Sequence, residues 1–117
     1  MTISLPIWTK TKDNQRQHWS SKARTSRQER TAAYYSVMAS HPPPFPWRVT
    51  VTRCGPRKLD VCNLGSALKA IIDGVADAAG VDDGDERWEW NLRQRKQSLY
   101  GVEIEIQPLT PDADVIK

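Results

Sequence analysis

The stretch from Arg57 to Trp88, RKLDVCNLGSALKAIIDGVADAAGVDDGDERW, contains a helix pattern with acidic residues at both ends. At 100° per residue its apolar side chains fall within an arc of ~100°, and its polar side chains fall on the opposite side within ~80°. The apolar set is Leu64, Leu68, Ile71, Ile72, Val75 and Ala79, and the polar set is Ser66, Lys69, Asp73 and Asp77. Asn63 is a suitable N-cap and Gly80 a suitable C-terminal stop. The pattern predicts a helix over residues 64–79 with one face in the core.

The upstream segments predict a strand, a helix and a second strand. The short alternating stretch at 2–6, TISLP, ends in a proline and is typical of an edge strand, and residues 7–17 are a polar loop. From His18 to Ala39 the chain lacks Gly and Pro, which favours a helix. Its apolar stripe can include Trp19, Ala23, Ala33, Tyr34, Val37 and Met38. The proline-rich stretch at 41–46 is a stiff connector into WRVTVTR at 47–53, the clearest strand of the chain.

Two further alternating segments follow the central helix. RWEWNLRQ places Trp88, Trp90 and Leu92 on one face, and GVEIEIQP does the same for Val102, Ile104 and Ile106. The intervening RKQSLYG predicts a hairpin loop. This order of elements predicts an α+β, two-layer domain in which a mixed β-sheet of about four strands carries two helices on one face. The length of 117 residues suits a single domain over 1–117, with a frayed tail at 110–117.

Charge is distributed unevenly along the chain. Residues 1–58 hold eleven Lys and Arg against two acidic residues, a balance of +9, and residues 59–117 hold six against twelve, a balance of −6. A basic half suits a polyanionic partner, although both halves can equally be solvated surface.

Composition also bounds the location and the class of site. The sequence has no apolar run of the ~18–20 residues that a membrane helix needs, and its N-terminus lacks the layout of a signal peptide. Cytoplasm is therefore the expected location. Cys54 and Cys62 are expected to be free thiols, because the chain does not offer four closely spaced zinc ligands.

The acidic residues beside the central helix allow two interpretations. Clustered carboxylates bind hard cations such as Mg²⁺, and a metal so held can activate water against a phosphodiester. However, Asp60 and the run Asp82, Asp83, Asp85, Glu86 flank opposite ends of a helix ~24 Å long. A shared site then requires the acidic turn to fold back or two subunits to pair. The alternative is a polar glycine turn, beside an exposed Lys69–Asp73 pair worth only ~0.3–0.5 kcal/mol.

The segment LDVCNLGSALKAIIDGVADAAGVDD resembles the signature of the RusA family of Holliday-junction resolvases, which are short phage-type endonucleases. In that signature Asp-x-Asp-Asn leads into a helix with Lys-Ala-x-x-Asp-Ala/Gly, followed by a Gly and an Asp pair. Other parts resemble the family in the same order along the chain. The opening strand and Asn-rich basic loop of the family resemble ISLP and NQRQHW. Its Pro-led strand resembles PPFPWRVTVTRCGPRKLD, and its closing strand resembles GVEIEI. The resemblance covers nearly the whole chain.

The resemblance implies roles for individual residues. Asp60 matches the first motif aspartate and is expected to be catalytic and to hold the metal, Mg²⁺ or also Mn²⁺. Asn63 matches the motif Asn, and Lys69 matches the catalytic lysine, one helical turn farther from the Asn than in some members. Cys62 departs from the motif, because the second aspartate belongs there and a neutral thiol is a poor ligand for Mg²⁺.

The second metal-ligating aspartate has two possible registers. Asp83 belongs to the literal Asp pair, whereas Asp85 lies five residues after Gly80, as in the family; Asp85 is slightly favoured, and both are expected to be catalytic and metal-binding.

The resemblance also implies a homodimer whose acidic residues line a basic cleft. The residues expected to grip branched DNA through its phosphates are Arg16, Lys22, Arg24, Arg57 and Lys58. Trp8 and Trp19 can stack on unpaired bases, or else belong to the core.

Two functions follow. The first is a Mg²⁺-dependent, structure-selective endodeoxyribonuclease that resolves four-way junctions in recombination, repair or phage DNA processing, in the cytoplasm of a phage-infected or prophage-bearing bacterial cell. The second is a catalytically impaired relative that serves as a DNA-binding or host-interaction module, with Cys62 marking the lost activity.

Overall fold

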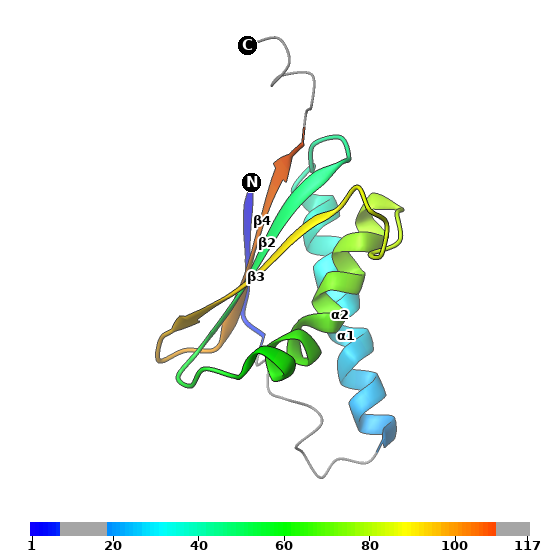
Figure 1. The fold of residues 1–117 in the computed structure, drawn as a ribbon. Coiled ribbons are helices and arrows are strands. Elements are labelled where there is room, and N and C mark those ends of the chain that lie inside the picture. Colours follow the sequence, from blue (N-terminus) through cyan, green and yellow to red (C-terminus); the bar gives the residue numbers. More distant parts are fainter. Residues whose placement is uncertain (8–18, 110–117) are drawn as a thin grey trace.

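A single mixed sheet with helices on one face organises the chain, as predicted (Figure 1). The computed structural model describes residues 1–7 and 19–109, without the side chains of residues 19–24. Its elements are β1 (Thr2–Leu5), α1 (Trp19–Ala39), β2 (Trp47–Gly55), α2 (Val61–Ala79), β3 (Glu89–Lys96) and β4 (Gly101–Pro108). Residues 8–17 of the predicted loop at 7–17 and the predicted tail at 110–117 lie outside the described residues. The described helices include none that is long and apolar enough to cross a membrane.

The predicted hairpin between the last two strands is wrong. The sheet order is β1-β4-β2-β3, so β4 lies between β1 and β2, and β3 pairs with β2 in parallel at the opposite edge. The segment 97–100 instead crosses the end of β2, where the Gln97 N–H donates to the Gly55 carbonyl at 2.9 Å. The position of β4 inside the sheet and of β3 at its edge agrees with their burial: the inward side chains of β4 are fully buried, whereas Leu92 of β3 is 37% exposed. A central position in the sheet suits β4, and an edge position suits β3.

The core lies between the sheet and α2. The predicted stripe is confirmed for Leu64, Leu68, Ile71 and Val75, which are buried against the inward side chains of β2 and β4, while Ile72 and Ala79 are partly buried at its margin. On α1 the stripe includes the buried Ala33 and Val37, but Met38 is 45% exposed. The side chains of Trp19 and Ala23 lie outside the described residues. Both cysteines are free, with Cys54 buried and Cys62 exposed.

Helix α2 begins three residues earlier than predicted, because Asp60 and not Asn63 caps it. Asp60 has extended backbone angles, and its Oδ1 accepts the Asn63 backbone N–H at 2.9 Å. A carboxylate at this position also interacts favourably with the positive end of the helix dipole. The C-terminus is as predicted: Gly80 has φ +70°, the left-handed conformation, and its N–H donates to the last turn.

Candidate functional site

The acidic turn after α2 folds back onto the exposed face of that helix. Lys69 Nζ donates to Asp83 Oδ2 at 2.8 Å and contacts Asp73 Oδ1 at 2.9 Å. These interactions, with Asp83 first and Asp73 next, raise the pKa of Lys69 above its ordinary value of 10.5. One subunit is therefore sufficient to bring the motif lysine and an aspartate of the acidic turn together.

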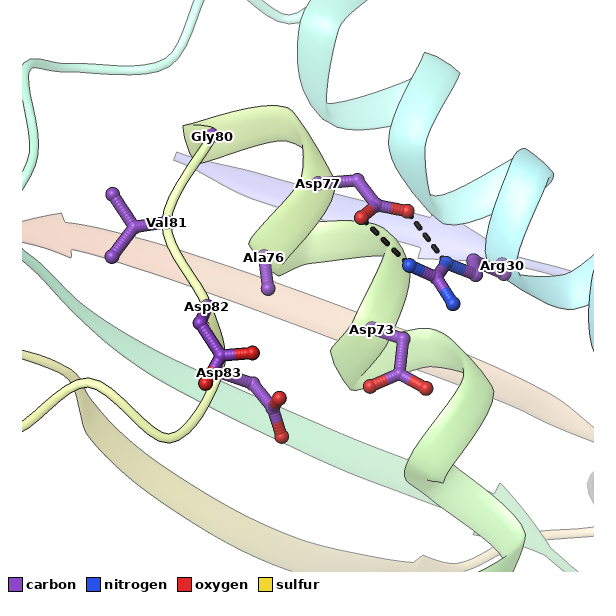
Figure 2. A pocket seen from close by; sticks show the side chains of 8 residues that line it. All are labelled: Arg30, Asp73, Ala76, Asp77, Gly80, Val81, Asp82 and Asp83. Carbon is purple, nitrogen blue, oxygen red and sulfur yellow. Dashed lines mark hydrogen bonds and ion pairs between the residues drawn. The ribbon is translucent and has the colours of Figure 1, made fainter.

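An open pocket of about 210 Å³ lies beside this contact (Figure 2). Asp73 and Asp77 of α2 line one side of the pocket and Asp82 and Asp83 of the turn line the other, while Arg30 enters from α1 and meets Asp77. Arg30 binds Asp77 through two bonds, from Nε to Oδ2 at 2.6 Å and from Nη2 to Oδ1 at 2.9 Å. These bonds raise the pKa of Arg30 and lower that of Asp77. Sequence reasoning missed Arg30, because its partner is a tertiary neighbour 47 positions away.

Asp85 points to a different partner. Its two carboxylate oxygens accept from Arg87 Nε and Nη2, each at 3.0 Å, and Oδ1 also accepts the Arg87 backbone N–H at 2.9 Å. These bonds hold the pKa of Asp85 at about 2, below its ordinary 3.8. Of the two registers proposed for the second aspartate, the structure brings Asp83 to Lys69 and pairs Asp85 with Arg87.

The Asp85–Arg87 pair leads to a prediction about acid. An Arg87→Gln variant is expected to return the pKa of Asp85 toward 3.8, because it removes the guanidinium bonds that stabilise the carboxylate. A depressed pKa in the folded state contributes stability above the unfolded pKa, and this contribution is lost as the pH falls from about 3.8 to about 2. Carboxyl ¹³C NMR titration measures the shift. Arg93→Gln on β3 is the control, and an equal Asp85 pKa in both variants would contradict the assignment.

Asp60 lies at the other end of α2 from the acidic turn. Its Oδ1 accepts the Asn63 N–H and its Oδ2 accepts Asn63 Nδ2 at 3.1 Å, while the carboxylate remains exposed. It precedes Lys69 by nine residues, about 13 Å along the helix at 1.5 Å per residue. Among residues 1–7 and 25–109, no three His, Cys, Asp or Glu side chains are placed to hold a metal ion. A single subunit thus brings together Lys69 and Asp83 but not a complete ligand set that includes Asp60.

The segment before Asp60 is held by Gln94 of β3. The Leu59 N–H donates to Gln94 Oε1 and the Leu59 carbonyl accepts from Gln94 Nε2, both at 2.7 Å. The Gln94 amide thus makes the two backbone hydrogen bonds that a neighbouring strand would make to Leu59, and it fixes where the chain enters α2. The sequence carried no signal for this role, because it depends on the parallel pairing of β2 with β3.

Basic residues gather near the start of α2. Arg57 and Lys58 are exposed, and the Arg57 carbonyl accepts from Arg53 Nη1 at 2.5 Å. Lys96 lies opposite Gly55 in the parallel register, two residues before Arg57 in the chain, a neighbour that the predicted hairpin did not give it. Arg16 and Trp8 lie outside the described residues, as do the side chains of Lys22, Arg24 and Trp19.

In comparisons with known proteins, the sequence matched no family model and no curated protein. The similarity to junction resolvases therefore rests on the motif residues, and the function remains a prediction. The geometry that bears on it is the contact of Lys69 on α2 with Asp83 of the following turn, and the position of Asp60 at the N-cap of the same helix.

Proposed function

We propose that this chain is a Mg²⁺-dependent endonuclease that nicks branched DNA such as four-way junctions and acts as a homodimer. Its setting would be recombination, repair or phage DNA processing in the cytoplasm of a phage-infected or prophage-bearing bacterial cell. The observation that carries the proposal is the 2.8 Å contact between Lys69 and Asp83. Two residues that match the motif, and that are 14 positions apart, meet on the exposed side of the helix that Asp60 caps.

The metal would be held by Asp60 with Asp83 or Asp85. These residues supply the hard carboxylate oxygens that Mg²⁺ or Mn²⁺ prefers. When bound, the metal supplies an activated water and neutralises charge on the phosphodiester. One subunit does not gather a complete ligand set from its described residues, so the proposal assigns the remaining ligands to the partner subunit of the dimer.

Lys69 would stabilise negative charge on the phosphate. Its ammonium is exposed, and with a pKa above the ordinary 10.5 it is protonated at neutral pH. A cation beside the scissile phosphate stabilises the charge that develops in the transition state. In the free protein Asp83 and Asp73 hold the ammonium in place.

DNA would be held by the basic residues near Asp60. Arg57 and Lys58 lie within three residues of Asp60, just before α2 begins, and Lys96 lies opposite Gly55 at the end of β2. Arg16, Lys22 and Arg24 of the basic first half would extend this contact along a junction arm. Affinity carried by phosphate contacts falls as the salt concentration rises.

The second candidate is a DNA-binding or host-interaction module without nuclease activity. It is favoured by Cys62, whose exposed thiol occupies the place of the second motif aspartate. Both carboxylate oxygens of Asp60 also accept hydrogen bonds from Asn63, which is sufficient for a purely structural cap.

A nicking assay separates the two candidates. The purified chain is expected to nick a synthetic four-way junction with labelled arms in Mg²⁺ or Mn²⁺, to be inactive in a chelator, and to leave a linear duplex of the same sequence intact. Sedimentation measured in parallel is expected to give a dimer. Junction binding without nicking in either metal would favour the second candidate, and a failure to bind would overturn the first candidate and the DNA-binding form of the second.

A further inference from the structure

Two indole N–H groups hold the backbone of the acidic turn. Trp88 Nε1 donates to the Asp82 carbonyl at 2.7 Å, and Trp90 Nε1 donates to the Asp83 carbonyl at 3.1 Å. The two rings are stacked, with centroids 4.5 Å apart and planes inclined by 22°. Consecutive carbonyls of the turn are thus bound by two stacked donors.

The direction of these donors is set by the core. Trp88 is buried, and its ring lies edge-on to Phe45 at 4.8 Å and to Trp47 at 5.7 Å between centroids. Trp90 is partly buried beside it. Rings packed on several sides keep a single rotamer, so the indole N–H groups have fixed positions relative to the sheet.

Fixing the turn has a consequence for the carboxylate of Asp83. Four acidic residues, Asp82, Asp83, Asp85 and Glu86, lie within five positions, and their mutual repulsion favours an open turn. The Asp83 carbonyl that Trp90 binds belongs to the residue whose side chain contacts Lys69. Restraining that carbonyl limits the region that the carboxylate can reach.

We propose that Trp88 and Trp90 are positioning residues for the candidate site, with their indole N–H groups keeping the acidic turn folded back so that Asp83 stays on Lys69. The significance of this role for catalysis rests on the proposed function. The positioning itself does not, because the Asp83–Lys69 contact can be measured without DNA.

The direct test is a Trp90→Phe variant, which removes the donor but keeps an aromatic ring. The pKa of Lys69, followed by NMR on ¹³C-labelled lysine, is expected to fall toward 10.5, in the same direction as in Asp83→Asn. The fall is expected to be partial, since Asp73 still binds the ammonium. Trp47→Phe is the matched control, because its indole belongs to the same aromatic cluster but donates to the Pro43 carbonyl at 2.7 Å. Equal Lys69 pKa values in Trp90→Phe and the wild type would overturn the proposal.

Two further measurements keep the test decisive. If Trp90→Phe does not fold, hydrogen exchange of the Trp90 indole N–H in the wild type replaces it, and exchange as fast as that of a free indole would overturn the proposal. If the wild type nicks junctions, Trp90→Phe is expected to lower kcat by about 10–100-fold at unchanged KM, in the range known for groups that orient catalytic ligands. If the wild type does not nick, the proposed function fails while the Lys69 pKa comparison still decides the positioning role.

Discussion

Replacing Gly74 by alanine is expected to lower the free energy of unfolding by up to about 2 kcal/mol, which is the usual overpacking cost of about 1–3 kcal/mol less the ~1 kcal/mol that alanine gains over glycine inside a helix. A Cβ at this position would lie 2.3 Å from the Arg30 carbonyl oxygen and 2.8 Å from the Ala33 Cβ. The nearest group is backbone, so no side chain can rotate away, and α1 and α2 would have to separate.

Gly65 provides a control in the same helix. A Cβ there meets nothing within 4 Å, so Gly65→Ala is expected to raise the free energy of unfolding by about 0.5–1 kcal/mol through helix propensity alone. Urea unfolding of both variants measures the difference. If the two substitutions change the stability in the same direction, the close approach of α1 to Gly74 is wrong.

The pattern of the sequence was sufficient to predict the elements but not their neighbours. Periodicities of 3.6 and 2 arise from how a segment buries one face, and so α2, β2 and β4 could be read from their own residues. The neighbour of a strand in the sheet cannot be predicted in this way, because alternation indicates that a strand is half-buried but not which strand lies beside it. The β3–β4 hairpin was predicted from the short loop between them, whereas β2 lies between these strands and pairs with both.

For the candidate site, too, the sequence predicted the residues but not the contacts between them. Motif context singled out Lys69 and, as the second metal-ligating aspartate, Asp83 or Asp85, yet the contact of Lys69 with Asp83 depends on how the turn after Gly80 is held. That restraint comes from Trp88 and Trp90, whose alternation predicted only a strand face. The start of α2 was ambiguous for a local reason: Asp60 and Asn63 are both good caps, and only the extended backbone at Asp60 distinguishes them.

The largest functional effect is expected from Asp60→Asn, which should reduce junction nicking by at least about 100-fold, the upper range for groups that merely support a metal ligand. The substitution removes the charge that the proposed metal would require. It retains a good N-cap, since Asn is as favourable as Asp at this position and can still accept the Asn63 N–H. A loss of nicking with an unchanged unfolding midpoint therefore reports chemistry and not misfolding.

Single-turnover nicking and junction binding, measured on the same preparation, show whether the Asp60 carboxylate acts as a metal ligand or only as a helix cap. Binding is expected to be unchanged or slightly tighter, because the variant removes a negative charge beside Arg57 and Lys58. Glu105→Gln, an exposed carboxylate of β4, removes the same charge away from α2 and is expected to nick at the wild-type rate. If Asp60→Asn nicks as fast as Glu105→Gln, then Asp60 is only a helix cap, and the metal must be held by carboxylates of the acidic turn alone.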